Sequence, residues 1–306
     1  MSRIAYLFVF LISFSADDSE VVPLLWQDHQ RIYRLAGADM VGGARPLVVH
    51  IHGFRKRDQA IADRGSLERV GWSALEQHAL GQEFLVASPA ALWGQWNLAP
   101  GLRNTTLPDG RSVDDAGFIF AVVRELIQTR RADPARIYLT GISDGAIMSY
   151  GLLCHPDSPF AAAVPVIGTM TERDRDACRA LYPAPLMVIA GTNDRVLPWD
   201  GWIFRVGREI SVPETLDFWR RIHSCTGQEA EMLEDLDPDD GSRVREINWT
   251  GCIAPRTVRL LRVEGGGHAV PRALRDGETR RKGRNSDIDA AEVAVNFLAR
   301  FKRPTE

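Results

Sequence analysis

The sequence predicts an α/β protein with a mostly parallel central sheet that helices cover on both faces. Short apolar runs alternate along the chain with longer stretches in which apolar residues recur at helical spacing. The run at residues 46–52 is almost continuously apolar and ends at Gly53, as expected of a strand that is buried on both faces. No linker-like segment divides the chain, so we expect a single domain over residues 17–306.

The strands are predicted from short apolar runs, rich in β-branched residues, that turn residues bound on either side. A leading strand is expected at residues 31–35. Further strands are expected at residues 46–52, 84–88, 137–140, 162–167, 186–190 and 258–263. Because helical stretches separate these strands, we expect most of them to run parallel.

Helices are expected where apolar residues repeat every three or four positions. Such stretches occur at residues 66–80, 213–223 and 287–301. A further helix ends at Asp133, and its apolar face consists of Phe118, Val122, Val123, Leu126 and Ile127. Ser112 is the expected N-cap of this helix, because a serine side chain accepts hydrogen bonds from the first turn. The charged segment at residues 275–285 is expected to be a surface loop whose role the sequence leaves open.

The composition is that of a soluble globular protein, with 45% hydrophobic and 25% charged residues among 306. The formal net charge of −3 gives no reason to expect nucleic acid or an anionic membrane as a partner. The sequence leaves the oligomeric state open.

The N-terminus has the layout of a secretory signal peptide at residues 1–16. Arg3 precedes an apolar run at residues 4–12, and small residues follow it. The run is too short to cross a bilayer as a helix, which takes about 20 residues. We therefore expect a secreted or periplasmic protein, with a buried first helix as the alternative.

Export would place the cysteines in an oxidising compartment, where an even number favours disulfides. The chain contains Cys154, Cys178, Cys225 and Cys252. Among the three possible pairings, we prefer the sequential one, which closes two short loops. Free buried cysteines would be the default if the N-terminus were not a signal peptide. No C-x-x-C motif occurs, so a zinc site is poorly supported and we expect no metal.

The stretch GISDG at residues 141–145 lies where a predicted strand must turn into a helix. The pattern G-x-S-x-G at such a junction is the nucleophile-elbow signature, in which the glycines let the chain bend and expose the serine hydroxyl. Ser143 is therefore a candidate nucleophile.

A serine nucleophile needs a base and a carboxylate that orients the base. Asp194 follows the predicted strand at residues 186–190, and His268 follows the strand at residues 258–263. The order of serine, acid and histidine is that of α/β-hydrolases, and all three lie just past strand ends, where open α/β sheets bind ligands. We predict that Ser143, Asp194 and His268 form a catalytic triad.

The segment after the strand at residues 46–52 is a candidate oxyanion hole. A turn at His52-Gly53 would deliver the backbone N–H of Phe54, and the N–H of Asp144 would be the second donor. His50 and His52 share one face of the strand, but no further ligand is near in sequence, so they do not indicate a metal site.

Tryptophans in loops near the predicted site are candidates for substrate binding. We expect Trp96 and Trp199 to bind substrate by stacking on a phenolic or sugar ring. Trp93 and Trp202 lie in the same two loops. The alternative is that at least two of these four side chains pack their own loops.

Several motifs together resemble one esterase family. They are PLVVHIHG, GQWN, VDDAGF, DPARIYLTGISDGAIMSYGLLC, FAAAVPVIG, GTNDRVLPWDG and VEGGGHAVP, and they extend over residues 45–301. The chain resembles the family that contains extracellular poly(3-hydroxybutyrate) depolymerases and feruloyl or acetylxylan esterases. This resemblance implies an α/β-hydrolase fold and cofactor-free hydrolysis of carboxylic esters through Ser143, Asp194 and His268. The cysteines also fall where such enzymes often carry disulfides.

The chain departs from the family pattern at two places near the predicted site. Val270 lies two residues after His268, where relatives commonly have an aromatic residue. Asp144 directly follows the nucleophile, where relatives more often have Asn or Ser. No separate surface-binding module is evident, so we expect small esters or soluble oligoesters rather than crystalline polymer as substrates. The resemblance also implies plant cell-wall esters as substrates. The alternatives are a serine peptidase on the same fold and a catalytically silent secreted binding protein.

Overall fold

A computed structural model describes residues 19–55, 71–98, 106–204, 207–253, 256–272 and 283–304 of the chain. The expected signal peptide at residues 1–16 lies outside these described residues. So do the first part of the helix expected at residues 66–80 and most of the loop at residues 275–285.

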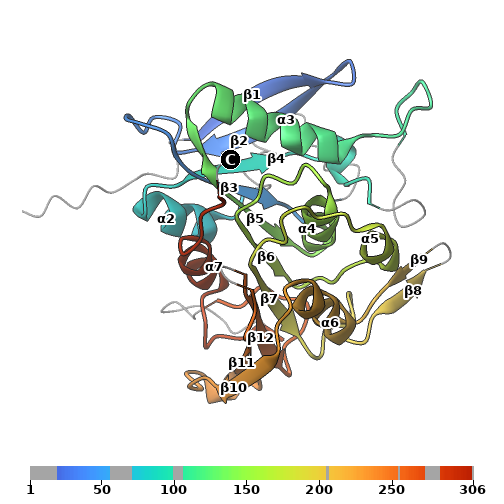
Figure 1. Cartoon of the computed structure of the whole chain (residues 1–306), viewed down its shortest axis with the longest axis vertical. Coiled ribbons are helices and arrows are strands. Elements are labelled where there is room, and N and C mark those ends of the chain that lie inside the picture. The colour runs from blue at the N-terminus through green and yellow to red at the C-terminus, as the bar shows by residue number, and fades with distance from the viewer. Residues whose placement is uncertain are drawn as a thin grey trace, which may run out of the picture.

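One mixed sheet runs through the middle of the molecule (Figure 1). Its strands, in the order in which they lie across the sheet, are β1 (Ser19–Trp26), β2 (His29–Ala36), β4 (Leu85–Pro89), β3 (Arg45–Ile51), β5 (Ala132–Ile142), β6 (Ala162–Val166), β7 (Leu186–Gly191), β12 (Val258–Glu264), β11 (Arg243–Thr250) and β10 (Gly227–Met232). The strands from β4 to β12 run parallel, and antiparallel pairs extend the sheet at both edges. The predicted α/β fold with a mostly parallel sheet is confirmed.

Helices cover both faces of this sheet. Helices α2 (Ser73–Gly81) and α7 (Ala290–Leu298) pack together on one face. The other face carries α3 (Asp115–Gln128), α4 (Asp144–Cys154) and α6 (Val212–Ile222). The remaining elements are short: α5 (Glu172–Ala177), the hairpin of β8 (Trp202–Phe204) and β9 (Gly207–Glu209), and the 3₁₀ turns η2 (Leu92–Gly94) and η3 (Pro238–Asp240). Each helix of the described residues is too short or too polar to span a lipid bilayer.

The central strands divide the apolar residues between two cores. In β3, Leu47 and Val49 belong to the core under α3, α4 and α6, whereas Val48 belongs to the core under α2 and α7. All three side chains are fully buried. Alternate residues of a strand point to opposite faces, so a strand covered on both faces must be apolar throughout. This explains the nearly continuous apolar run at residues 46–51.

Two local expectations were wrong. Asp114 rather than Ser112 caps α3, because its carboxylate accepts the N–H of Gly117 at 2.8 Å. The Ser112 hydroxyl instead accepts a hydrogen bond from the side-chain amide of Asn97 at 2.8 Å. Strand β5 also begins before the Asp133-Pro134 pair, because an irregular register with β3 accommodates the proline.

All four cysteines form disulfides, in the sequential pairing that the sequence favoured. The Cys154–Cys178 bond ties the end of α4 to the segment after α5, across 24 residues. The Cys225–Cys252 bond ties the segment before β10 to the segment after β11, across 27 residues. The first bond therefore braces the far end of the helix that begins beside Ser143.

Candidate active site

Ser143 occupies a sharp turn between β5 and α4. Its backbone has φ 58° and ψ −120°, a region that residues with a side chain rarely adopt. Such a conformation costs on the order of 1–3 kcal/mol and persists only where neighbours fix it. Here the Ser143 N–H donates to the carbonyl of Val166 at 3.0 Å, and its own carbonyl accepts the N–H of Ala146 at 2.8 Å.

The glycines on either side of Ser143 are required by close packing. A Cβ atom on Gly141 would overlap the carbonyl of Gly145, and one on Gly145 would overlap the carbonyl of Ile51 at the end of β3. The positive φ itself is carried by Ser143. The pattern G-x-S-x-G therefore lets α4 start directly against the strand ends, and this holds the serine hydroxyl above the sheet.

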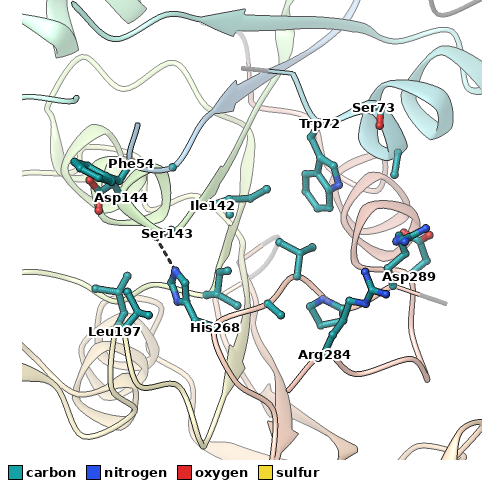
Figure 2. A pocket seen from close by; sticks show the side chains of 18 of the residues that line it. Phe54, Trp72, Ser73, Ile142, Ser143, Asp144, Leu197, His268, Arg284 and Asp289 are labelled. Carbon is teal, nitrogen blue, oxygen red and sulfur yellow. Dashed lines mark hydrogen bonds between the residues drawn. The ribbon is translucent and has the colours of Figure 1, made fainter. Parts of the chain in front are cut away.

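Ser143, His268 and Asp194 lie in one hydrogen-bonded row at the ends of β5, β12 and β7. Ser143 Oγ is 3.0 Å from His268 Nε2, a contact drawn in Figure 2, and His268 Nδ1 is 2.7 Å from Asp194 Oδ2. Asp194 is buried, and its other oxygen, Oδ1, accepts the backbone N–H groups of Val196 at 2.8 Å and Leu197 at 3.0 Å. These two bonds fix the carboxylate so that Oδ2 faces the imidazole.

The segment after β3 approaches Ser143 from one side. A Cβ atom on Gly53 would lie 3.3 Å from Ser143 Cβ, so the Gly53–Phe54 peptide is next to the nucleophile. Asp144 is the first residue of α4, where helix N–H groups point outward and favour negative charge. Both Phe54 and Asp144 line the cavity at Ser143, as Figure 2 shows.

Trp96 does not face a substrate, which corrects the sequence-based prediction. Its side chain is fully buried in the core, its indole N–H donates to the carbonyl of His52 at 2.8 Å, and its ring lies 4.8 Å from the His52 ring. An indole that is enclosed in this way cannot stack on a ligand. Trp96 instead holds the end of β3 in place.

Trp199 also lies away from the cavity that contains Ser143. It packs half-buried against the core under α6, and the guanidinium of Arg262 lies 5.1 Å from the centre of its ring. The carbonyl of Trp199 accepts the N–H of Val212 at the start of α6. Both predicted substrate-binding tryptophans therefore pack their own loops, the alternative that the sequence had left open.

Comparisons with known proteins identify relatives of the chain. No family model matches it. It is 28% identical over 292 residues to NocK, a putative esterase of Nocardia uniformis subsp. tsuyamanensis, covering 88% of this chain and 79% of NocK. It is 25% identical over 193 residues to feruloyl esterase B of Piromyces equi, covering 61% of this chain and 33% of that enzyme. Among solved structures, a thermostable esterase has a TM-score of 0.57 at 16% identity, over 94% of this chain and 64% of that one.

The chain is similar in sequence to feruloyl esterase-like proteins, and its fold is similar to that of solved esterases. It is a carboxylic ester hydrolase, and the α/β-hydrolase fold that the motifs implied is confirmed. This esterase spans only a third of the length of feruloyl esterase B.

The cavity of this esterase at Ser143 has a volume of about 920 Å³, near the upper end for small-molecule sites. Several residues that line this cavity belong to no motif in the sequence. Trp72, which directly precedes α2, lines it, as do Arg284 and Asp289 near the start of α7. These residues follow no strand end, so no motif marks them. Among the described residues, no group of three or more His, Cys, Asp or Glu side chains is placed to hold a metal ion.

Proposed function

We propose that this esterase cleaves carboxylic esters by nucleophilic catalysis at Ser143. The observation that carries the proposal is the continuous row from Ser143 Oγ through both nitrogens of His268 to Asp194 Oδ2, with contacts of 3.0 and 2.7 Å. These are hydrogen-bond distances for a nucleophile, its base and the group that orients the base. No step requires a cofactor.

In the first half of the reaction, His268 Nε2 takes the proton of the Ser143 hydroxyl as Oγ attacks the ester carbonyl. The negative charge that forms on the carbonyl oxygen is held by the backbone N–H groups of Phe54 and Asp144. Each such donor lowers the barrier by about 2.7–4 kcal/mol. The protonated His268 then gives its proton to the departing alcohol, which leaves an acyl group on Ser143.

In the second half, His268 takes a proton from water, and the resulting hydroxide attacks the acyl-enzyme. The acid is released and the proton returns to Ser143. Asp194 keeps Nδ1 of His268 protonated throughout, so that Nε2 is the basic nitrogen. The two backbone bonds to Asp194 Oδ1 support this role, because they prevent the carboxylate from turning away.

We infer that the substrates are small or oligomeric esters, namely feruloyl esters, acetylated sugars or hydroxyalkanoate oligomers. The similarity to feruloyl esterase B supports the first of these three classes. We also infer that the chain is exported after loss of residues 1–16, which the signal-like N-terminus and the two disulfides support. N-terminal sequencing of the exported protein tests the cleavage.

The nucleophile is tested by Ser143→Ala, with Ser149→Ala on the same helix as the matched control. Ser149 Oγ donates to the carbonyl of Gly145 at 2.7 Å and has no part in the proposed reaction. We expect Ser143→Ala to lower kcat for p-nitrophenyl acetate by at least about 10⁴-fold while the circular dichroism spectrum stays unchanged. Ser149→Ala should remain active.

Covalent labelling gives a second, independent readout. Diethyl p-nitrophenyl phosphate should add one diethyl phosphoryl group to Ser143, found by mass spectrometry of the peptide, and none to the Ser143→Ala protein. Activity that survives in Ser143→Ala, or a label on another serine, would reject the assignment. Faster turnover of a short peptide amide than of the matching ester would favour a peptidase instead.

A further inference from the structure

The cavity that opens on Ser143 has a far end that the proposed reaction does not use. In Figure 2, Ile142 lies between Ser143 and Trp72, and Arg284 and Asp289 lie at the end away from the nucleophile. Phe54, another aromatic side chain that lines the cavity, lies on the opposite side of Ser143. The residues of the far end are therefore available to hold a part of the substrate that does not react.

The indole of Trp72 is held in a fixed position at this far end. Its backbone carbonyl accepts the N–H of Glu76 at 2.9 Å in the first turn of α2. Its ring centre lies 5.7 Å from the ring of His50, a buried residue whose pKa burial lowers to about 3, so this neighbour is uncharged. The ring also packs against the core under α2 and α7. A ligand can therefore contact the indole without having to order it first.

Aliphatic side chains complete the surface around this indole. Ile142 and Val270 pack against the same core as Trp72, and all three line the cavity. Pro271, the residue after Val270, also lines the cavity. Its backbone carbonyl accepts a hydrogen bond from the N–H of Ala290 at 3.1 Å, so it lies beside the start of α7. The far end is thus a slot with an aromatic face and aliphatic neighbours.

Charged groups lie at the end of the slot. Arg284 is 8% exposed, and Asp289 caps α7 by accepting the N–H of Ala291 at 2.9 Å. A guanidinium carries five N–H donors in a plane, so Arg284 can donate a hydrogen bond to a ligand oxygen while it keeps its contacts within the protein. A hydroxyl group on the distal edge of a bound ring would meet this donor.

We propose that Trp72 is the stacking face for an aromatic ring of the ester substrate, and that the ring carries a hydroxyl group at the edge that reaches Arg284. This inference rests on ester hydrolysis at Ser143. A flat aromatic ring is apolar on both faces, which suits a slot between an indole and aliphatic side chains. A sugar ring would place several of its hydroxyl groups against those aliphatic walls without hydrogen-bond partners, which is unfavourable.

The test compares two esters of the same alcohol, methyl 4-hydroxycinnamate and methyl butyrate, followed by acid release in a pH-stat. We expect Trp72→Ala to raise KM for the aromatic ester roughly 10- to 100-fold, because stacking and burial of the ring are lost. KM for methyl butyrate should stay within about twofold. Trp72→Phe should restore most of the affinity, since it restores an aromatic face.

Arg284→Gln tests the polar end separately. It should reduce the difference in KM between methyl 4-hydroxycinnamate and methyl cinnamate, which lacks the hydroxyl group, and leave KM for methyl cinnamate unchanged.

Trp202→Ala is the matched control for Trp72→Ala, because Trp202 is 48% exposed and lies outside the described lining of the cavity. This control should bind both aromatic esters like the unaltered protein.

Equal effects of Trp72→Ala on the aromatic and aliphatic esters, or no effect on either, would overturn the inference. So would a raised KM for an acetylated methyl xyloside in place of the aromatic ester. If Trp72→Ala does not fold, Trp72→Leu keeps the apolar volume and carries the same expectation. Failure of the unaltered protein to hydrolyse any ester would instead refute the proposed function, so the two failures are distinguishable.

Discussion

At the scale of single residues, His52 has a fixed tautomer that bears on the oxyanion hole. The N–H of Ala91 donates to His52 Nε2 at 3.1 Å, so this nitrogen carries no proton. His52 Nδ1 therefore carries the hydrogen and donates it to the carbonyl of Gly53 at 2.6 Å. The Gly53 carbonyl and the Phe54 N–H belong to one planar peptide group, so holding the carbonyl also sets the direction of the N–H. His52 is thus a positioning residue for one proposed donor.

This role predicts a selective loss in His52→Phe, which keeps the ring beside Trp96 and removes the Nδ1 donor. We expect kcat to fall about 10- to 100-fold with KM nearly unchanged, because an oxyanion donor acts mainly in the transition state. His52→Asn should recover much of kcat, since its amide can donate in place of Nδ1. Steady-state kinetics with p-nitrophenyl acetate measures both constants.

His50→Phe is the control for this prediction. His50 is a buried residue of β3, and its ring contacts Trp72 rather than the peptide at Gly53. An equal fall of kcat in His50→Phe and His52→Phe would show a general packing effect and remove the positioning role.

The sequence located some site residues and not others for a physical reason. Ser143, Asp194 and His268 each follow shortly after the end of a buried strand. Their positions are therefore set mainly by the strand ends, which meet at one edge of the sheet, and less by the conformations of long loops. Trp96 was misassigned because the direction of a side chain in a long loop depends on distant segments. Its partner, the carbonyl of His52, is 44 residues away in the chain.

At the scale of elements, the contact between α4 and the sheet decides where the nucleophile lies. Gly145 leaves no room for a Cβ atom, because that atom would overlap the carbonyl of Ile51. Gly151, on the same helix, has ordinary space, since the nearest atoms to an added Cβ are 3.7 Å away in Asp174. The two glycines therefore differ in packing while they share one helix.

We expect Gly145→Ala to lower the free energy of unfolding by about 3 kcal/mol, the cost of overpacking a close contact. Gly151→Ala should leave this free energy unchanged or raise it by up to about 1 kcal/mol, because alanine favours a helix more than glycine does. Urea denaturation of both variants at neutral pH measures the difference. Equal stability of the two would contradict the close contact at Gly145.

Which strands could be predicted depended on where they lie in the sheet. Central strands such as β3 and β7 are covered on both faces, so their apolar runs stand out in the sequence. The edge strands β1 and β10 went unpredicted. Proline interrupts β1 at position 23, and β10 exposes most of its residues and has the sequence GQEAEM. Edge positions accept such residues because one side of the strand is free of hydrogen-bond partners in the sheet.

At the scale of the whole molecule, buried histidines make stability depend on pH. Burial, with smaller effects of His52 and Arg55, lowers the pKa of His50 to about 3. Burial lowers the pKa of His52 to about 4, and burial with nearby Arg256 lowers that of His223 to about 4. All three side chains stay neutral in the folded protein at pH values where an exposed histidine, with a pKa of 6.5, takes up a proton.

The sign of the effect follows from which state binds more protons. Below pH 6.5 the unfolded chain protonates these histidines and the folded chain does not, so acid favours unfolding. The loss begins near pH 6.5, grows by about 1.4 kcal/mol per pH unit for each histidine, and ends near the pKa of the folded state. At pH 5.5 the free energy of unfolding should be roughly 4 kcal/mol below its value at pH 8, if the three contributions add.

The dependence is measured by urea denaturation between pH 5 and pH 8. Burial raises the carboxyl pKa of Asp115 and Asp174, whose protonation acts in the opposite direction, so lower pH values are left out. His223→Leu keeps an apolar contact with Trp219 and removes one of the three buried histidines. In this variant, the slope of the free energy of unfolding against pH should fall by about a third below pH 6.5, since one of three protons is no longer taken up. His155→Gln, at a partly exposed position, should leave it unchanged. A protein that is as stable at pH 5.5 as at pH 8 would mean that these histidines can take up protons without unfolding.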